Sequence, residues 1–174
     1  ETTIVPNKFY DKKLERDFLS FNYLNPKLHL ASNRLQGLDS RVIWGIEKSV
    51  HSFLSRALLN PYFASHLSFL VPTFHKLHNK STSALFVNFN DDKLIDMIAF
   101  SRDKLMLAKT ITANSLLEES YYIQKTWEAL ELNIQSDILL FSGRTDKHSE
   151  CINTLKKVVL KTEDLSLKLL STTK

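Results

Sequence analysis

Residues 84–143 contain four strand-like runs, Ala84–Asn90 (ALFVNFN), Leu94–Phe100 (LIDMIAF), Leu105–Ile111 (LMLAKTI) and Asp137–Gly143 (DILLFSG). Each run is rich in aliphatic or aromatic residues and is bounded by polar residues, a pattern typical of β-strands. Short polar turns join the first three runs, at 91–93 and 101–104. An antiparallel meander is the simplest way to connect strands that are this close in sequence.

A long amphipathic helix is expected between the third and fourth strands, and a shorter helix after the fourth. The long helix is expected to have its cap at Thr112 or Asn114. Its apolar stripe consists of Leu116, Ile123, Trp127 and Leu130. The shorter helix spans 147–159 and points Cys151, Ile152, Leu155 and Val158 inward. A final strand is expected at 165–170. The order β-β-β-α-β-α predicts an α/β domain that resembles one half of an actin or RNase H type of fold.

The first part of the chain combines helices with one hairpin. We expect helices at 7–21, 47–59 and 68–78, and two strands of a hairpin within 28–46. The apolar face of the second helix is formed by Val50, Phe53, Leu54, Ala57 and Leu58. The polar segment 79–83 is the best domain boundary. The sequence therefore predicts one domain at 1–80 and a second at 81–174.

The composition is that of an ordinary globular protein. Of the 174 residues, 43% are hydrophobic and 24% are charged, and the formal net charge is +4. This excess is spread along the chain, whereas nucleic-acid footprints are usually clustered, so we expect no nucleic-acid partner. Cys151 is the only cysteine, which excludes an internal disulfide and fits a reducing, cytoplasmic compartment. No apolar run is long enough to span a membrane, so we expect no membrane partner.

Three stretches carry a resemblance to a known family. They are Val5-Pro6 with the helix that ends in Phe18–Asn22 (FLSFN), His66–Val71 (HLSFLV), and Leu116–Ile123 (LLEESYYI) with the strand that follows it. In these stretches the chain is similar to an uncharacterised bacterial family whose fold is related to actin-like ATPases. The resemblance implies two RNase H-like subdomains that face each other across a cleft. It also places the opening strands of the first subdomain upstream of Glu1, so we expect residues 1–80 to be an incomplete subdomain.

The resemblance also indicates where a nucleotide would bind. Actin-like ATPases hold phosphates at glycine-containing turns that follow a strand, where backbone N–H groups can approach the phosphate. The corresponding turn here, Asn88-Phe89-Asn90, has no glycine, and Ser142-Gly143-Arg144 only half matches the turn on which adenosine lies. The candidate cleft residues are Asn88, Asn90, Asp91, Ser142, Gly143 and Arg144. We expect no cofactor in this cleft, and the alternative is ATP with Mg²⁺.

The residues needed for nuclease, zinc-binding or cysteine chemistry are incomplete in this sequence. A nuclease of the RNase H type needs carboxylates where Asn88 and Ser142 stand. His75-x-x-His78 and His148-x-x-Cys151 have the spacing of zinc-binding pairs, but each lacks an evident third ligand. Cys151 lies on the inward stripe of its helix, which favours a buried thiol over a nucleophile. We therefore predict neither catalytic nor metal-binding residues.

The predicted function is that of a non-catalytic actin-like module, a pseudoenzyme of unknown cellular role. We expect it to act through protein–protein contacts, with a partner protein or as a homodimer. The alternative is a nucleotide-binding ATPase of the same fold whose first phosphate loop lies upstream of Glu1. A nucleic-acid binder is a third possibility, which rests only on mild basicity and on exposed aromatic residues such as Tyr122.

Overall fold

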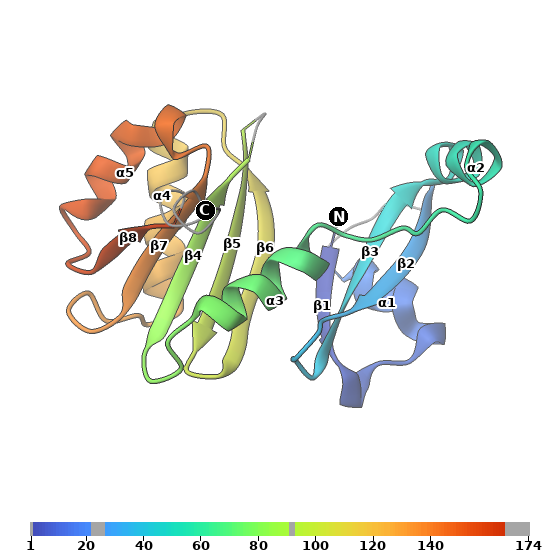
Figure 1. The fold of residues 1–174 in the computed structure, drawn as a ribbon, viewed down its shortest axis with the longest axis horizontal. Helices are drawn as coiled ribbons and strands as arrows, with labels where there is room; N and C mark the ends of the chain where they lie inside the picture. Colours follow the sequence, from blue (N-terminus) through green and yellow to red (C-terminus); the bar gives the residue numbers. More distant parts are fainter. Residues whose placement is uncertain (1, 22–26, 91–92, 166–174) are drawn as a thin grey trace, which may run out of the picture. The chain divides into compact units, whose positions relative to one another are not determined.

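The computed structural model describes residues 2–21, 27–90 and 93–165 of the chain. These residues belong to two compact units, Glu1–Thr73 and Phe74–Lys174 (Figure 1). The division falls inside helix α3 (Leu67–Leu77), and the predicted boundary at residue 80 lies in the turn that follows this helix. No helix in the described part of the chain has the length and apolar character needed to cross a bilayer.

The second unit is built on a five-stranded sheet. Its strands are β4 (Ser83–Phe89), β5 (Leu94–Ser101), β6 (Lys104–Thr112), β7 (Ile138–Gly143) and β8 (Thr162–Asp164). The spatial order is β6-β5-β4-β7-β8, with β4, β5 and β6 antiparallel and with β7 parallel to both β4 and β8. The predicted meander and the predicted order β-β-β-α-β-α are therefore confirmed.

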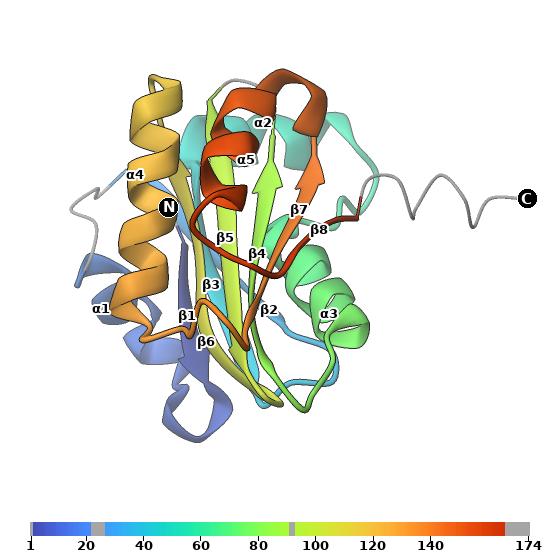
Figure 2. The same cartoon turned by 90° about the vertical axis from the view of Figure 1, so that its left-hand side faces the viewer.

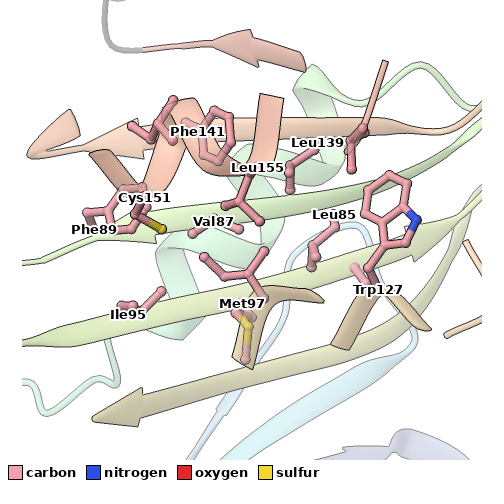
Figure 3. Close-up of a cluster of buried hydrophobic side chains, with 14 of the residues drawn as sticks. Leu85, Val87, Phe89, Ile95, Met97, Trp127, Leu139, Phe141, Cys151 and Leu155 are labelled. Carbon is pink, nitrogen blue, oxygen red and sulfur yellow. The ribbon is translucent and has the colours of Figure 1, made fainter. Parts of the chain in front are cut away.

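Two helices cover one face of this sheet, α4 (Leu116–Ala129) and α5 (Ser149–Lys156) (Figure 2). Alternate residues of β4, β5 and β7 point toward them, because successive side chains of a strand face opposite sides. Figure 3 shows these side chains meeting Trp127, Cys151 and Leu155 from the helices in one layer. Trp127 and Cys151 are buried, as predicted, but Leu116 at the start of the stripe is partly exposed.

The opposite face of the sheet packs against the C-terminal part of α3. The Phe74 ring stacks on Phe86 of β4 with 4.6 Å between ring centroids, and His78 stacks on Phe100 of β5 at 5.5 Å. Asn88 follows Phe86 by two residues and lies on this same face. The polar residues considered below therefore occupy the end of an otherwise apolar face.

Helix α4 begins at a cap that the sequence analysis missed. We expected Thr112 or Asn114, but Ser115 is the cap, and its Oγ accepts a hydrogen bond from the Glu118 amide at 3.2 Å. The Glu118 carboxylate in turn accepts a hydrogen bond from the Asn114 amide at 2.8 Å. This reciprocal arrangement resembles a capping box, and the Ser-x-x-Glu spacing from Ser115 to Glu118 was its signal.

The end of the second unit differs from the prediction in two respects. A 3-10 turn (Thr145–His148) precedes α5, and α5 ends at Lys156 rather than near residue 159. Because the helix ends early, Val159 is buried and Val158 is 46% exposed, so the inward assignment of Val158 was wrong. The last strand, β8, begins before the predicted 165–170, and residues 166–170 lie outside the described part of the chain.

The first unit contains a three-stranded antiparallel sheet. Its strands are β1 (Thr2–Pro6), β2 (Leu28–Arg34) and β3 (Ser40–Glu47), in the order β1-β3-β2. The predicted hairpin within 28–46 is confirmed as β2 and β3. Three antiparallel strands do not by themselves identify an RNase H-like subdomain, so that assignment of this unit stays a prediction.

The expected helix at 7–21 was wrong over most of its length. The segment forms two 3-10 turns, Asn7–Phe9 and Lys12–Leu14, before the short helix α1 (Glu15–Ser20). Tyr10 and Asp11 between the turns adopt extended backbone, and the Asp11 side chain accepts a hydrogen bond from the Lys13 amide. An Asp that satisfies a nearby backbone amide in this way competes with helix formation.

Helix α2 (Lys48–Ala57) forms close to its predicted limits, but its apolar face is not a core face. None of its residues is buried, and Phe53 is 64% exposed. The helical periodicity was interpreted correctly and the burial was not, because a pattern identifies an apolar face without showing what covers it.

The buried position of Cys151 gives a testable prediction. Burial raises the pKa of its thiol from the ordinary 9.0 to about 11. Since only the thiolate is nucleophilic, native protein at pH 8 should react with a thiol reagent such as dithiobisnitrobenzoate far more slowly than protein unfolded in urea. Rapid labelling of the native protein would contradict the buried position.

The same pKa shift predicts a loss of stability in alkali. Below pH 9 the thiol is neutral in both states, and between pH 9 and 11 the unfolded chain releases a proton that the folded chain retains. The free energy of unfolding should therefore fall with pH in this window, and less so in Cys151→Ala. Urea denaturation of both proteins at pH 8 and pH 10.5 checks this expectation.

Candidate functional site

A row of polar side chains crosses the second unit's sheet near the carboxyl ends of β4 and β7. Asn88 on β4 is paired with Ser142 on β7 and with Asp96 on β5, and Asp96 is paired with Thr110 on β6. Residues that are paired directly across neighbouring strands point to the same face. The register therefore brings together side chains from four strands, far apart in sequence.

Hydrogen bonds connect this row through the carboxylate of Asp96, which is fully buried. Thr110 Oγ1 donates to Asp96 Oδ1 at 2.6 Å, and Asn88 Nδ2 and Asn90 Nδ2 donate to Oδ2 at 3.2 and 2.7 Å. Ser142 Oγ donates to Asn88 Oδ1 at 3.0 Å. We call these five residues the Asp96 network. A buried carboxylate is costly unless it is hydrogen-bonded, and three donors offset that cost here.

The backbone amides of the two turns are also engaged within the chain. The Asn90 amide donates to the Leu94 carbonyl at 3.0 Å, across the turn between β4 and β5. The Arg144 amide donates to the Phe89 carbonyl at 2.9 Å, so the turn after β7 is attached to the end of β4. The amides at the expected phosphate-binding positions therefore point at carbonyl oxygens.

Gly143 is required by the close approach of these two strand ends. Its φ of +79° lies in the left-handed region, and a Cβ atom there would collide with the Phe89 carbonyl oxygen and lie 2.9 Å from Asn88 Oδ1. Glycine is the only residue that avoids both penalties. The half match to a nucleotide-binding turn thus has a structural explanation in the packing of β7 against β4.

Five of the predicted cleft residues lie together: Asn88, Asn90, Ser142, Gly143 and Arg144. The sixth, Asp91, lies outside the described residues. The structure adds Asp96 and Thr110, which the sequence analysis did not single out. The available signal was a charged residue inside an apolar strand, in the run Leu94–Phe100. The chemical role of the five residues stays a prediction.

The two pairs with zinc-binding spacing, which were not expected to bind metal, have other partners. His75 Nε2 lies 2.8 Å from Asp103 Oδ1, and His78 Nε2 donates to the Arg102 carbonyl at 2.7 Å, so both rings contact the turn between β5 and β6. Lys80 and then His75 hold the pKa of the exposed Asp103 carboxyl below its usual value. Among the described residues no group of three His, Cys, Asp or Glu is placed to hold a metal.

The second pair also has partners within the chain, on neighbouring residues of α4. His148 Nδ1 lies 2.9 Å from Glu119 Oε2, and the imidazole stacks on Phe89 with 4.3 Å between ring centroids. Cys151 Sγ instead accepts a hydrogen bond from Ser120 Oγ at 3.3 Å. The His148 ring therefore supports the end of β4 from the helix side of the sheet, opposite the Asp96 network.

These contacts predict that Asp96 is a stabilising residue. Asp96→Asn replaces one acceptor oxygen by an NH₂ group that cannot accept, and hydrogen bonds to a charged group are worth about 1.5–3 kcal/mol. We expect the free energy of unfolding to fall by about 2 kcal/mol in urea denaturation. The exposed Asp146 is the control, since Asp146→Asn should change stability by less than about 0.5 kcal/mol. Equal effects of the two substitutions would contradict the role of the network.

Gly143 and Gly37 form a second matched pair, because their φ angles are +79° and +77°. Both alanine variants carry the cost of a left-handed residue, about 1–2 kcal/mol. Only Gly143→Ala adds a collision, since no atom lies within 4 Å of a Cβ at Gly37. Gly143→Ala should therefore destabilise the protein by at least about 1 kcal/mol more than Gly37→Ala. Thermal and urea denaturation would test this difference.

Comparisons with known proteins agree with this fold. Residues 1–160 match a family described as "Protein of unknown function (DUF3822)". No curated protein matches the sequence. A crystal structure from Bacteroides thetaiotaomicron, described as a protein with actin-like ATPase fold and unknown function, has 22% sequence identity and a TM-score of 0.86. The match covers 99% of this chain and 70% of that chain.

A second solved structure is more distant. It is described as the PilM-PilN type IV pilus biogenesis complex, with 12% identity and a TM-score of 0.59. The match covers 94% of this chain and 65% of that chain, so this chain spans less than two thirds of that neighbour. Likeness at such identities shows the fold alone, and it confirms the resemblance found in the sequence. The chain belongs to the DUF3822 family of proteins of unknown function and has an actin-like ATPase fold.

Proposed function

We propose that this chain is a non-catalytic actin-like module that acts through protein contacts. The observation that carries the first part is the internal use of the polar groups at the candidate site. Backbone amides bind phosphate when they are free to point at it, as at helix N-termini and in concave turns. Here the Asn90 and Arg144 amides donate to the carbonyls of Leu94 and Phe89.

Binding a polyphosphate at this site would require these bonds to break. Each intramolecular hydrogen bond contributes about 1 kcal/mol, and the freed carbonyls would need new partners. The Asn88 and Asn90 side chains would also have to leave the buried Asp96 carboxylate, which costs more because that acceptor is charged. The arrangement favours a site that holds two strand ends together over one that receives a nucleotide.

Exposed apolar side chains support the second part of the proposal. Phe21, Leu59 and Tyr62 of the first unit and Leu117 of the second are each at least 80% exposed. Exposed apolar residues that gather on a surface mark interaction sites in soluble proteins. The PilM-PilN structure is a complex of two proteins on a related fold, which makes a protein partner a reasonable expectation here. A partner protein or a second copy of the chain, in the cytoplasm, fits this proposal.

The alternative function is nucleotide binding, with a first phosphate loop upstream of Glu1. Gly143 is the feature that favours it, since glycine after a strand is what an adenosine-binding turn would retain. The close approach of Gly143 to Phe89 accounts for that glycine without a ligand. We therefore place this alternative second.

Titration calorimetry of the full-length gene product with ATP and Mg²⁺ separates the two functions. We expect no saturable binding tighter than about 1 mM, which corresponds to about −4 kcal/mol. The same samples should hydrolyse ATP no faster than buffer does. Saturable binding that is lost in Gly143→Ala, but kept in Gly37→Ala, would establish the alternative.

A further inference from the structure

His78, the residue that follows α3, is buried with one ring nitrogen in use and the other without a partner. Only 6% of His78 is exposed. Its Nε2 donates a hydrogen bond to the Arg102 carbonyl at 2.7 Å, so Nε2 carries the proton of the neutral ring. Nδ1 is buried, and no described residue forms a hydrogen bond with it. A neutral imidazole fits this place, because the unused nitrogen is then a lone pair and not an N–H group.

A proton on His78 would put a charge and a second N–H group into apolar surroundings. The ring stacks on Phe100 with 5.5 Å between centroids and meets Phe86 edge to face at 6.3 Å. Both phenylalanines are fully buried. A buried N–H group without an acceptor is costly, and a buried charge is costlier still. The ring therefore binds a proton at its ordinary affinity only after it has moved into water.

The charged groups around His78 do not remove this cost. From the turn between β5 and β6, Asp103 favours the charged ring, whereas Lys80 after α3 and a protonated His75 on α3 oppose it. The strands β4 and β5 face the ring with Phe86 and Phe100. Burial is the largest effect, and it lowers the pKa of His78 from the ordinary 6.5, although the hydrogen bond to the backbone and Asp103 act against it.

His75, three residues earlier, meets acid differently. It is as deeply buried as His78, at 7% exposure, but its Nε2 lies 2.8 Å from Asp103 Oδ1. A protonated His75 therefore has a carboxylate to pair with, and the Asp103 side chain is 64% exposed, so water also reaches this pair. The two histidines contact the same turn, and only His78 has nothing to receive an additional proton.

We propose that the end of α3 is an acid-sensitive attachment, which holds the second unit's sheet while His78 is neutral and opens more often once His78 is protonated. Opening would uncover the aromatic rings of Phe74, Phe86 and Phe100, which are buried in the closed form. The boundary between the two units falls inside this same helix, between Thr73 and Phe74. Acid would thus loosen the hold of the second unit on the helix through which the chain enters it. This pH response is independent of the proposed function.

The size of the response follows from the linkage between proton binding and opening. In the open form His78 has the ordinary pKa of 6.5, and in the closed form its pKa is lower. The attachment is therefore at full strength above pH 6.5 and weakens as the pH falls below it. Each pH unit below 6.5 can raise the open fraction by at most about tenfold, and the rise ends where the closed form also takes up a proton.

Hydrogen exchange of the full chain, measured by mass spectrometry at pH 7.5 and pH 5.5, tests the proposal. After correction for the intrinsic pH dependence of exchange, we expect the protection of residues 74–78 to fall about threefold or more at pH 5.5. Strand β7 belongs to the same sheet and serves as the internal reference, and its protection should change by less.

Two matched variants identify the titrating group. His78→Gln keeps a donor for the Arg102 carbonyl and takes up no proton in this range, so the pH response should disappear. His75→Gln is the control, because His75 is equally buried and contacts the same turn, and it should retain the response. The imidazole resonance of His78 in the unaltered protein gives a measurement that needs no variant, and it should titrate below pH 6.5.

Four results would overturn the proposal. They are equal protection of residues 74–78 at both pH values, a pH response that persists in His78→Gln, a His78 resonance that titrates at or above pH 6.5, and a loss of protection in β7 as large as that in α3. The last result would show general acid unfolding and no local opening.

Discussion

The buried carboxylate of Asp96 is the constraint on which the candidate site depends. A buried carboxylate inside a sheet needs hydrogen-bond donors, and Thr110, Asn88 and the neighbouring Asn90 donate to this one. Once Asn88 is turned toward Asp96, its oxygen accepts from Ser142 and the end of β7 is joined to β4. The two turns then lie so close that only glycine fits at position 143. The side chains around one buried carboxylate thus join the same strand ends whose backbone amides a phosphate would need.

Much of the fold could be predicted, because the strands of the second unit have a strong local signal. Each apolar run lies within one or two residues of its strand, and short turns leave a meander as the simplest connection. The helix expected at 7–21 failed for the local reason given by Asp11 and also for a non-local one. The Tyr10 hydroxyl contacts Glu15 and also Ser32 of β2, and these contacts accompany an extended backbone at Tyr10. Apolar periodicity in the sequence cannot reveal a contact with a strand that follows later in the chain.

The sequence placed five of the candidate residues together, but it did not reveal the hydrogen bonds among them. The resemblance placed Asn88 and Ser142 in one cleft, and the structure pairs them across the parallel strands β4 and β7. Asp96 and Thr110 belong to the site because of the pairing register between β4, β5 and β6. A sequence does not show which residues of neighbouring strands are paired. From the sequence alone, Asn88 stands where an RNase H-type nuclease needs a carboxylate. In the structure Asn88 Nδ2 donates a hydrogen bond to Asp96 on the neighbouring strand β5.

The two units differ in which side chains they leave exposed. In the second unit the polar side chains at the strand ends are hydrogen-bonded to one another. In the first unit the apolar residues of α2 are turned outward although the helix itself is anchored through His51. Helical periodicity predicts an apolar face equally well whether the same chain or another protein covers it. Since the described part of this chain leaves Phe53 exposed, the periodicity of α2 does not by itself indicate burial within this unit.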